Sequence, residues 1–274
     1  MSLSPSRDFP PGDYHSPADL KPQWWARPFP TLAFYTGVLR IVSWSKDLAC
    51  HNEYDDQRWA EASWSVCRQF ERCGAPLHIE GVDRFKGLEG PLVFIGNHMS
   101  TAETFMLGVV IGQHKPVTFV VKKSLVDYPL FGPVMRSRNP VVVGRENARD
   151  DLKAVLEGGE ARLKRGRSMI VFPQRTRTVD FRPNEFNSIG VKLAKRAGCT
   201  VVPLAVKTDA WGNGTKLKDF GPFDAQKPVH IAFGEPLEVT GSGKEANDAV
   251  IAFIQNKLAE WEEQDAAWLT TRRS

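Results

Sequence analysis

The stretch PLVFIGNHMSTAETFMLGVVIGQ, residues 91–113, contains a short apolar run, a polar turn and a segment of helical period. The run LVFI predicts a buried strand, and apolar residues recur at helical spacing from about residue 101. The same alternation continues downstream. Further strand-like runs are VTFVV, PVVVG, SMIVF, CTVVPLAV and VHIAF, and further helical segments lie at about 147–164 and 187–197. Strands that alternate with helices predict an α/β fold whose central sheet is mostly parallel and flanked by helices.

Other segments lie outside this alternating region. Residues 1–28 are rich in Pro, Ser, Asp and Arg and lack apolar periodicity, which predicts a loosely ordered arm. Residues 31–50 and 54–73 have the apolar spacing of two helices, and a last long helix is expected from Lys244 to about Glu263. We therefore expect three parts: an arm over 1–28, an N-terminal two-helix element over 29–74 and an α/β domain over 75–274.

The composition is that of an ordinary globular protein, with 274 residues of which 42% are hydrophobic and 25% charged. The longest charge-free apolar run near the N-terminus lies between Arg27 and Arg40, well short of the roughly 20 residues that span a bilayer. No basic start followed by an apolar core precedes it, so neither a spanning helix nor a secretory signal is predicted. The four cysteines show no CxxC pair and no neighbouring histidine at metal-ligand spacing, and no metal site is expected.

Positive charge is concentrated in one part of the chain. Between Lys115 and Thr200 there are 18 Lys and Arg against 8 Asp and Glu, whereas the net charge of the whole chain is only +4. This concentration favours a phosphate-bearing partner, although solvated helix faces explain much of the charge over residues 148–166. Without a recognition helix, a zinc framework or an aromatic RNA-binding signature, we expect no nucleic acid among the partners.

The turn after the strand-like run LVFI holds the first candidate for chemistry. His98 lies at the end of the predicted strand, and Glu103 lies in the first turn of the helix that follows, where the helix dipole favours a carboxylate. A carboxylate on one imidazole nitrogen fixes the tautomer and leaves the other nitrogen free to accept a proton from a hydroxyl. The alternative interpretation is a helix-capping glutamate beside a surface histidine.

A second candidate site is a group of arginines at strand ends. The run SMIVF leads into FPQRTR, residues 172–177, and Arg145 follows the run PVVVG. Arg145, Arg175 and Arg177 are therefore expected at the carboxyl edge of a parallel sheet, where ligands of open α/β sheets bind. Guanidinium groups and backbone amides at such a turn suit a phosphate. Taken singly, each arginine also fits an ordinary surface salt bridge.

Four blocks in this order resemble those of the glycerolipid and lysophospholipid acyltransferases, over about residues 75–260. NHMSTAE resembles the family's Asn-His block with its acid five positions after the histidine, and FGPVMRSRNPVVVGR resembles the second block. FPQRTR stands where the family has Phe-Pro-Glu-Gly-Thr-Arg, and VVPLAV around Pro203 resembles the fourth block. The order of the four blocks makes the resemblance much more specific than any one of them.

The resemblance implies transfer of a fatty acyl group from acyl-CoA or acyl carrier protein to the hydroxyl of a lysophospholipid such as 1-acylglycerol-3-phosphate. By resemblance, His98 is the general base and Glu103 holds it, while Arg145 and Arg177 match the arginines that hold the acceptor phosphate. The substrate-binding residues expected on this basis are Arg145, Gln174, Arg175, Thr176 and Arg177. Neither a metal nor an organic cofactor is implied, because the hydroxyl attacks the thioester directly.

Two departures from the family pattern stand out, one in the acid of the first block and one in the third block. Glu103 replaces the usual Asp, which changes the reach of the acid and keeps its charge. Gln174 and Arg175 replace Glu and Gly, which shifts the local charge by two positive units and is expected to alter the acceptor. The alternatives left open are the same chemistry on another acceptor, such as an amino-acid lipid or a glycolipid, and a non-catalytic lipid-binding relative.

Aromatic residues flank the N-terminal apolar stretch, which is too short to span a bilayer. Because aromatic rings favour the membrane interface, the two-helix element is expected to lie on the cytoplasmic face of a membrane and make the protein peripheral. The alternative is that the same rings pack into the core of the α/β domain. The residues concerned are Trp24, Trp25, Phe29, Phe34, Tyr35 and Trp44.

Overall fold

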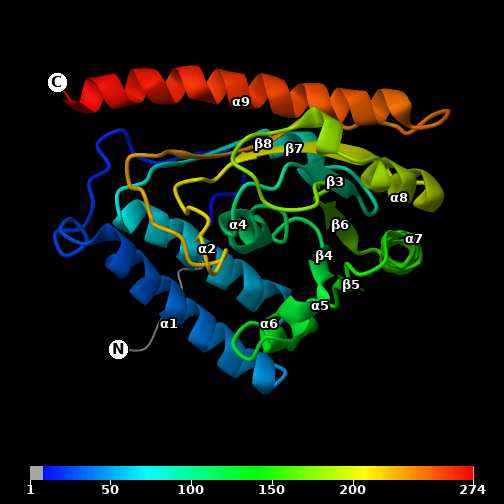
Figure 1. Ribbon diagram of the computed structural model, residues 1–274, viewed down its shortest axis with the longest axis horizontal. Helices are drawn as coiled ribbons and strands as arrows, with labels where there is room; N and C mark the ends of the chain where they lie inside the picture. Colours follow the sequence, from blue (N-terminus) through cyan, green and yellow to red (C-terminus); the bar gives the residue numbers. More distant parts are fainter. Residues whose placement is uncertain (1–8, 274) are drawn as a thin grey trace.

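The computed structural model in Figure 1 describes residues 9–273 and has one mixed sheet with helices on both faces. The strand order in the described part is β1-β2-β8-β7-β3-β6-β4-β5, and only the β1–β2 and β7–β8 pairs are antiparallel. The strands are β1 (Tyr14–His15), β2 (Leu77–Glu80), β3 (Val93–Gly96), β4 (Val117–Lys122), β5 (Val141–Val143), β6 (Ser168–Val171), β7 (Val201–Lys207) and β8 (Val229–Phe233). This arrangement confirms the α/β fold with a mostly parallel sheet.

The helices form two layers around the sheet (Figure 1). One layer contains α1 (Pro30–Cys50), α2 (Asp56–Arg72) and α4 (Ala102–Val110), and the opposite layer contains α7 (Ala148–Leu163), α8 (Ile189–Ala197) and α9 (Lys244–Arg273). Shorter helices are α3 (Asp83–Lys86), α5 (Lys123–Asp127), α6 (Gly132–Ser137) and the 3₁₀ turn Pro183–Glu185. The last helix, α9, continues ten residues beyond the end expected from the sequence.

The central strand β3 is buried on both faces, as expected for a parallel strand covered by helices on each side. Phe94 packs into the apolar cluster that contains α1, α2 and α4. Val93 and Ile95 point the other way, into the cluster that contains α7, α8 and α9. The carboxyl end of β3, where His98 follows, is therefore fixed from both sides.

Close packing of α2 against α4 fixes the helix that carries Glu103. A Cβ atom on Gly108 of α4 would collide with the side chains of Trp59 and Ser63 on α2. The absence of a side chain at Gly108 allows the two helices to approach, and Met106 and Leu107 beside it are fully buried. The first turn of α4, with Glu103, is consequently held in one position against the sheet.

Residues 9–28 of the expected arm have little regular secondary structure but lie against the fold, and residues 1–8 lie outside the described residues. Tyr14 pairs with Ile79 across the β1–β2 ladder. The hydroxyls of Tyr14 and Ser16 donate hydrogen bonds to Oε1 of Glu71, at 2.6 and 2.5 Å. Side-chain hydrogen bonds to a buried carboxylate hold this segment, and such an anchor leaves no apolar periodicity in the sequence.

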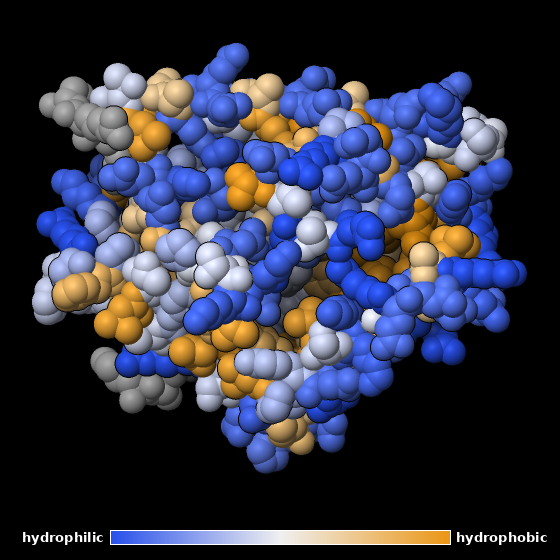
Figure 2. Space-filling view, viewed as in Figure 1, coloured by the Kyte–Doolittle hydropathy of each residue, from blue (hydrophilic) through white to orange (hydrophobic). Residues whose placement is uncertain are grey.

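The two N-terminal helices lie where the sequence places them, and they share one apolar core with α4 and the sheet. Phe34 and Val38 of α1 are buried, whereas Leu32 and Leu39 on the same helix are exposed. Figure 2 shows hydrophobic side chains over α1 and around a hollow between α1 and the sheet. No helix within residues 9–273 is both long and apolar enough to cross a bilayer.

Candidate active site

A reciprocal pair of hydrogen bonds shapes the turn that carries His98. The side chain of Asn97, immediately after β3, donates from Nδ2 to the carbonyl oxygen of Val206 at 2.8 Å and accepts from the Val206 amide at 2.9 Å. These bonds replace ladder hydrogen bonds at the point where β3 leaves β7. The carbonyl of His98 in turn accepts from the amide of Thr178 at 3.0 Å. His98 is thus fixed at the carboxyl edge of the sheet.

His98 and Glu103 form the pair that the sequence suggests. Nδ1 of His98 lies 2.8 Å from Oε1 of Glu103, whose side chain is fully buried. The carboxylate also accepts hydrogen bonds from the amides of Met99 and Ser100 and from the hydroxyl of Thr208 at 2.6 Å. Burial by itself raises the pKa of Glu103, but the hydrogen bonds and charge of His98, and the bonds from Thr208 and the backbone, outweigh it and hold that pKa below its ordinary value.

The imidazole of His98 is held in one plane. Phe172 stacks on it, with the ring centroids 4.5 Å apart and the planes 8° from parallel. With Nδ1 committed to the ionised Glu103, the tautomer has its proton on Nδ1, and Nε2 carries the free lone pair. The side chain is 18% exposed and lines a cavity. This arrangement provides a proton acceptor of fixed orientation that a substrate can reach.

The structure places Gln174 behind His98 and not in the cavity, contrary to its expected role in substrate binding. Its side chain is buried; Oε1 accepts from the amide of His98 at 2.6 Å, and Nε2 donates to the hydroxyl of Thr178 at 3.0 Å. The Thr178 hydroxyl itself donates to the carbonyl of Asp180. An amide satisfies both neighbours here, because one end must accept and the other must donate. Gln174 therefore supports the turn of His98.

Arg145, Thr176 and Arg177 line the same cavity as His98, whereas Arg175 lies outside it with an exposed side chain. The carbonyl of Arg175 accepts a hydrogen bond from Nη1 of Arg145 at 2.5 Å. Arg145 has a positive φ of 62°, in the left-handed region, and the Asp151 carboxylate accepts from its amide at 3.1 Å. Arg177 forms an ion pair with Asp219, with Nη1 and Oδ1 2.7 Å apart. Two of the three expected arginines thus reach the site.

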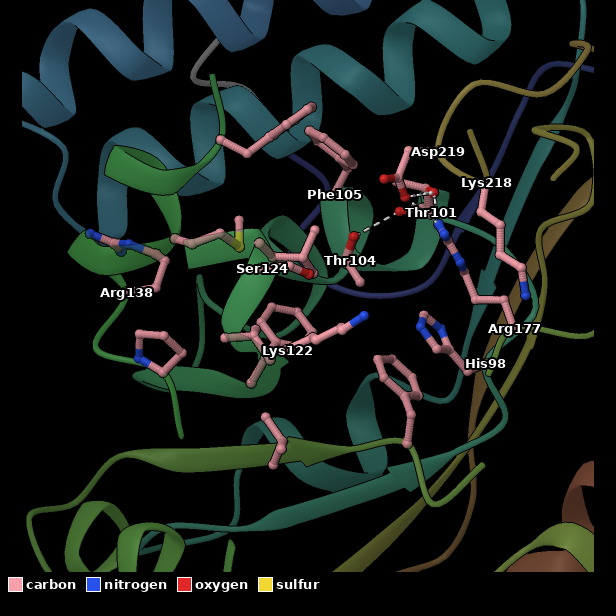
Figure 3. A pocket seen from close by; sticks show the side chains of 18 of the residues that line it. His98, Thr101, Thr104, Phe105, Lys122, Ser124, Arg138, Arg177, Lys218 and Asp219 are labelled. Atoms are coloured by element: carbon pink, nitrogen blue, oxygen red, sulfur yellow. Dashed lines mark hydrogen bonds and ion pairs between the residues drawn. The ribbon is translucent and has the colours of Figure 1, made fainter. Parts of the chain in front are cut away.

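The cavity has a volume of about 450 Å³ and differs in character between its two ends. His98 and Arg177 lie at one end, and Arg138 lies at the other (Figure 3). The walls between them are largely apolar and come from α1, α2, α4, α6 and the sheet. Residues of this apolar part include Tyr35, Val38, Trp59, Phe105, Phe119, Phe131 and Met135.

Arg138 closes the far end of the cavity and is itself buried. Its guanidinium forms an ion pair with Asp56, at 2.7 Å, donates to the carbonyl of Tyr54 and lies over the Trp59 ring. These partners satisfy the buried charge, so Arg138 is a structural end wall.

Several cavity residues escaped the sequence analysis. Lys218 and Asp219 come from the segment between β7 and β8, and Tyr35 comes from α1. The segment has no apolar period, and the only sequence signal it carries is a set of glycines, Gly212, Gly214 and Gly221. Within residues 9–273, no group of three or more His, Cys, Asp and Glu side chains is arranged to hold a metal ion.

Comparisons with known proteins agree with this fold and these blocks. The Acyltransferase family matches residues 76–207. A 1-acyl-sn-glycerol-3-phosphate acyltransferase of Pseudomonas aeruginosa is 28% identical over 192 residues, which cover 68% of this chain and 70% of the relative. A probable 1-acyl-sn-glycerol-3-phosphate acyltransferase of Mycoplasma pneumoniae is 30% identical over 118 residues, which cover 42% of this chain and 44% of the relative.

A solved structure supports the fold independently. The crystal structure of the 1-acyl-sn-glycerophosphate acyltransferase PlsC from Thermotoga maritima superimposes with a TM-score of 0.64 at 19% identity. The match covers 85% of this chain and 94% of the PlsC chain. Together the comparisons agree with the resemblance of the four sequence blocks to the glycerolipid acyltransferases: residues 76–207 match the Acyltransferase family, and the fold is similar to that of PlsC.

Proposed function

We propose that this protein transfers a fatty acyl group from acyl-CoA or acyl carrier protein to the free hydroxyl of 1-acylglycerol-3-phosphate. The observation that carries the proposal is the His98–Glu103 pair at the polar end of a cavity that also contains Arg145 and Arg177 and an apolar extension. A base, a site for a phosphate and room for an alkyl chain are the three requirements of this reaction. The names of the relatives in Pseudomonas and Mycoplasma support the same acceptor.

In the proposed mechanism, Nε2 of His98 accepts the proton of the acceptor hydroxyl as its oxygen attacks the thioester carbonyl. The ionised Glu103 stabilises the imidazolium that forms, because its carboxylate lies 2.8 Å from Nδ1. The new C–O bond remains, the C–S bond breaks, and His98 returns the proton to the departing thiolate. The thioester is already activated, so the reaction requires no protein nucleophile and no organic cofactor.

The two ends of the cavity suit two different parts of the substrates, a phosphate and an alkyl chain. Arg145 and Arg177, with Thr176 beside them, are placed to bind the acceptor phosphate by charge-assisted hydrogen bonds. The apolar extension toward Arg138 suits an alkyl chain, since each buried methylene contributes about 0.8 kcal/mol. Trp59, Phe119 and Met135 form part of its wall.

We further propose that the protein acts at the cytoplasmic face of a membrane, docked by an apolar surface at the start of α1. Trp24, Phe29 and Leu32 are 82%, 67% and 64% exposed, and Trp25 and Leu39 extend the same surface. Leu39 also lines the cavity, so this surface adjoins the entrance through which a lipid would arrive. The concentration of positive charge after Lys115 favours anionic lipid.

A panel assay tests the proposed function. The purified protein is incubated with lysophosphatidate, other lysophospholipids, an amino-acid lipid or a glycolipid, each with acyl-CoA and with acyl carrier protein loaded with the same chain. Mass spectrometry should show phosphatidate as the main new lipid and far less of it with His98→Ala. A different main product, or phosphatidate formed equally by His98→Ala, would contradict the proposal. Co-sedimentation with vesicles, with and without anionic lipid, tests the docking surface, with Trp24→Ser and Phe29→Ser together as the variant.

A further inference from the structure

Arg177, which the proposed function assigns to the acceptor phosphate, already holds an anion of the protein itself. Oδ1 of Asp219 lies 2.7 Å from Nη1 of Arg177. The hydroxyl of Thr101 bonds to both groups, since it accepts from Arg177 and lies 3.2 Å from Oδ1 of Asp219. Figure 3 shows the three side chains meeting beside His98, with Lys218 next to them. The carboxylate of Asp219 is thus already paired with Arg177, the cation beside the proposed base His98.

A carboxylate on a guanidinium resembles a phosphate on a guanidinium in charge and hydrogen-bond geometry. An acceptor phosphate cannot use the same Nη1 donor of Arg177 while Asp219 remains there, because two anions would then share one cation and repel each other. Asp219 must therefore move, or the phosphate must bind elsewhere. The anion that binds has to compete with Asp219 for Arg177.

The segment that carries Asp219 is suited to such a displacement. Its tip is open to solvent: Leu217 is exposed, and the Asp219 side chain is 40% exposed. The polar contacts of the tip include the bond from Nζ of Lys218 to the Thr176 hydroxyl, at 2.9 Å, and the bond from the Trp211 indole to the Asp219 carbonyl, at 3.2 Å. Phe220, next to Asp219, packs on the Tyr35 ring with the centroids 5.7 Å apart, so the movement would involve the Asp219 side chain and the exposed residues before it.

The base of the same segment is anchored to α1. The Tyr35 hydroxyl donates to the carbonyl of Gly221 at 2.6 Å, and Phe34 stacks on Phe223 with the ring centroids 4.2 Å apart. Trp211 at the other end is buried. A fixed base with an exposed tip allows Asp219 to leave Arg177 without unfolding the surrounding core.

We propose that Asp219 is a specificity-determining residue, whose carboxylate occupies Arg177 in the free enzyme and is displaced by the phosphate of an acceptor. A phosphomonoester has a charge of about −1.5 to −2 at pH 7, against −1 for a carboxylate, which favours the displacement. The free energy needed to release Asp219 is the same whichever phosphate binds, so it lowers the apparent affinity for every phosphate-bearing acceptor by the same factor. A phosphate-free acceptor does not need Arg177 and is unaffected. The ion pair therefore narrows the preference of the site for phosphate-bearing over phosphate-free acceptors. This inference rests on the proposed function.

The test compares Asp219→Asn with Asp224→Asn, which removes the same charge from an exposed position of the same segment outside the cavity. We measure kcat/KM for lysophosphatidate, for a lysophosphatidylglycerol and for a monoacylglycerol without phosphate. Asp219→Asn should raise kcat/KM for lysophosphatidate and for the phosphodiester alike by about tenfold or more, the size of one charge-assisted hydrogen bond, and leave that for monoacylglycerol unchanged. The selectivity for phosphate-bearing over phosphate-free acceptors should rise accordingly, while Asp224→Asn leaves it unchanged.

Inorganic phosphate provides a second readout that does not depend on turnover. Binding of phosphate, followed by calorimetry, should be tighter in Asp219→Asn than in the wild type, and Arg177→Ala in the Asp219→Asn background should remove the gain. An unchanged ratio of kcat/KM for lysophosphatidate to that for monoacylglycerol in Asp219→Asn, with unchanged phosphate binding, would overturn the inference while the proposed function stands. Failure of the wild type to acylate lysophosphatidate would instead overturn the proposed function.

Discussion

Two histidine–carboxylate pairs in the described part of the chain have the same N–O distance and very different surroundings. Nδ1 of His98 lies 2.8 Å from Glu103, and Nε2 of His230 lies 2.8 Å from Asp265. In both pairs burial raises the pKa of the carboxyl, and hydrogen bonds from the histidine and other donors outweigh it and hold that pKa below its ordinary value. Hydrogen-bond geometry and charge therefore do not distinguish them.

Access to the second ring nitrogen does distinguish them. His98 follows the end of β3 and lines the cavity, with 18% of its side chain exposed. His230 lies within β8, is 4% exposed and stacks on Trp261 of α9, and its Nδ1 has no hydrogen-bond partner. A pair at the carboxyl edge of the sheet can take a proton from a substrate, whereas a pair in the middle of a strand can only hold the fold together.

The largest expected effect follows from removing His98. His98→Ala should lower kcat by about 10²–10⁴-fold, because general-base assistance contributes that much. His230→Ala should leave the activity per folded molecule unchanged and lower the free energy of unfolding, since it leaves Asp265 with one partner fewer. Steady-state kinetics with urea denaturation of each variant checks both. Comparable losses of kcat per folded molecule in the two variants would break the distinction drawn between the pairs.

The carboxylates should differ in the same way, with a smaller effect. Glu103→Gln should lower kcat about 10²-fold, because an amide that donates to Nδ1 of His98 places the proton on the wrong nitrogen. Asp265→Asn should cost about 1–3 kcal/mol of unfolding free energy through its bonds to His230 and Lys207, with kcat unaffected. Proton NMR of the imidazole nitrogens would report the tautomer of His98 directly. A normal kcat in Glu103→Gln would show that the tautomer does not matter.

Both pairs also have a cation nearby, and its expected role differs. Arg177→Ala should raise the KM for a phosphate-bearing acceptor by about 10–100-fold, equivalent to 1.5–3 kcal/mol, with little change for the acyl donor. Lys207, 2.5 Å from Asp265, should affect only stability when changed to Met. Kinetics with lysophosphatidate and with monoacylglycerol separates the two roles. An equal loss on both acceptors in Arg177→Ala would argue against phosphate binding.

The sequence predicted strongly periodic elements well and the geometry of the site only in part. Six strands and the helices α4, α7 and α8 appear as β-branched runs or helical periods, because their burial follows the period of the element. The strand β1 has only two residues, and β2 alternates buried and half-buried positions over only four residues, which is too short a run to be recognised. Such short elements depend on tertiary partners that no local pattern records.

The same reason explains what was missed at the site. His98 and Glu103 are five positions apart, so one strand–helix turn brings them together and the sequence reveals the pair. Asp219 lies far from Arg177 along the chain, and only the folded segment between β7 and β8 joins them. For Gln174, the position of the block was informative but the direction of the side chain was not. A residue in a turn faces either the cavity or the backbone behind it, and hydrogen-bond partners settle which.

The smallest expected effect concerns how the free energy of unfolding depends on pH through the histidines. His78 lies between the two other histidines of its sheet edge, with Nδ1 3.0 Å from His15 and its ring stacked on His230. Burial, followed by the charges of His230 and His15, lowers the pKa of His78 to about 4, against the opposing influence of Asp265 and Glu80. The folded state thus keeps His78 neutral where the unfolded chain takes up a proton.

Because the folded pKa is depressed, the stability that His78 contributes is present above pH 6.5 and is lost as the pH falls toward 4. The full shift corresponds to about 3 kcal/mol, and partial exposure to solvent reduces the expected loss to about 1–2 kcal/mol. The pKa of Glu103 is also lowered, so its carboxylate keeps its contribution to a pH below the ordinary pKa of a glutamate. Urea denaturation at pH 7, 5.5 and 4.5 should therefore show a decline that His78→Gln flattens and that His51→Gln, at an exposed position, does not. A decline of the same steepness in His78→Gln would show that the loss of stability in acid comes from another group.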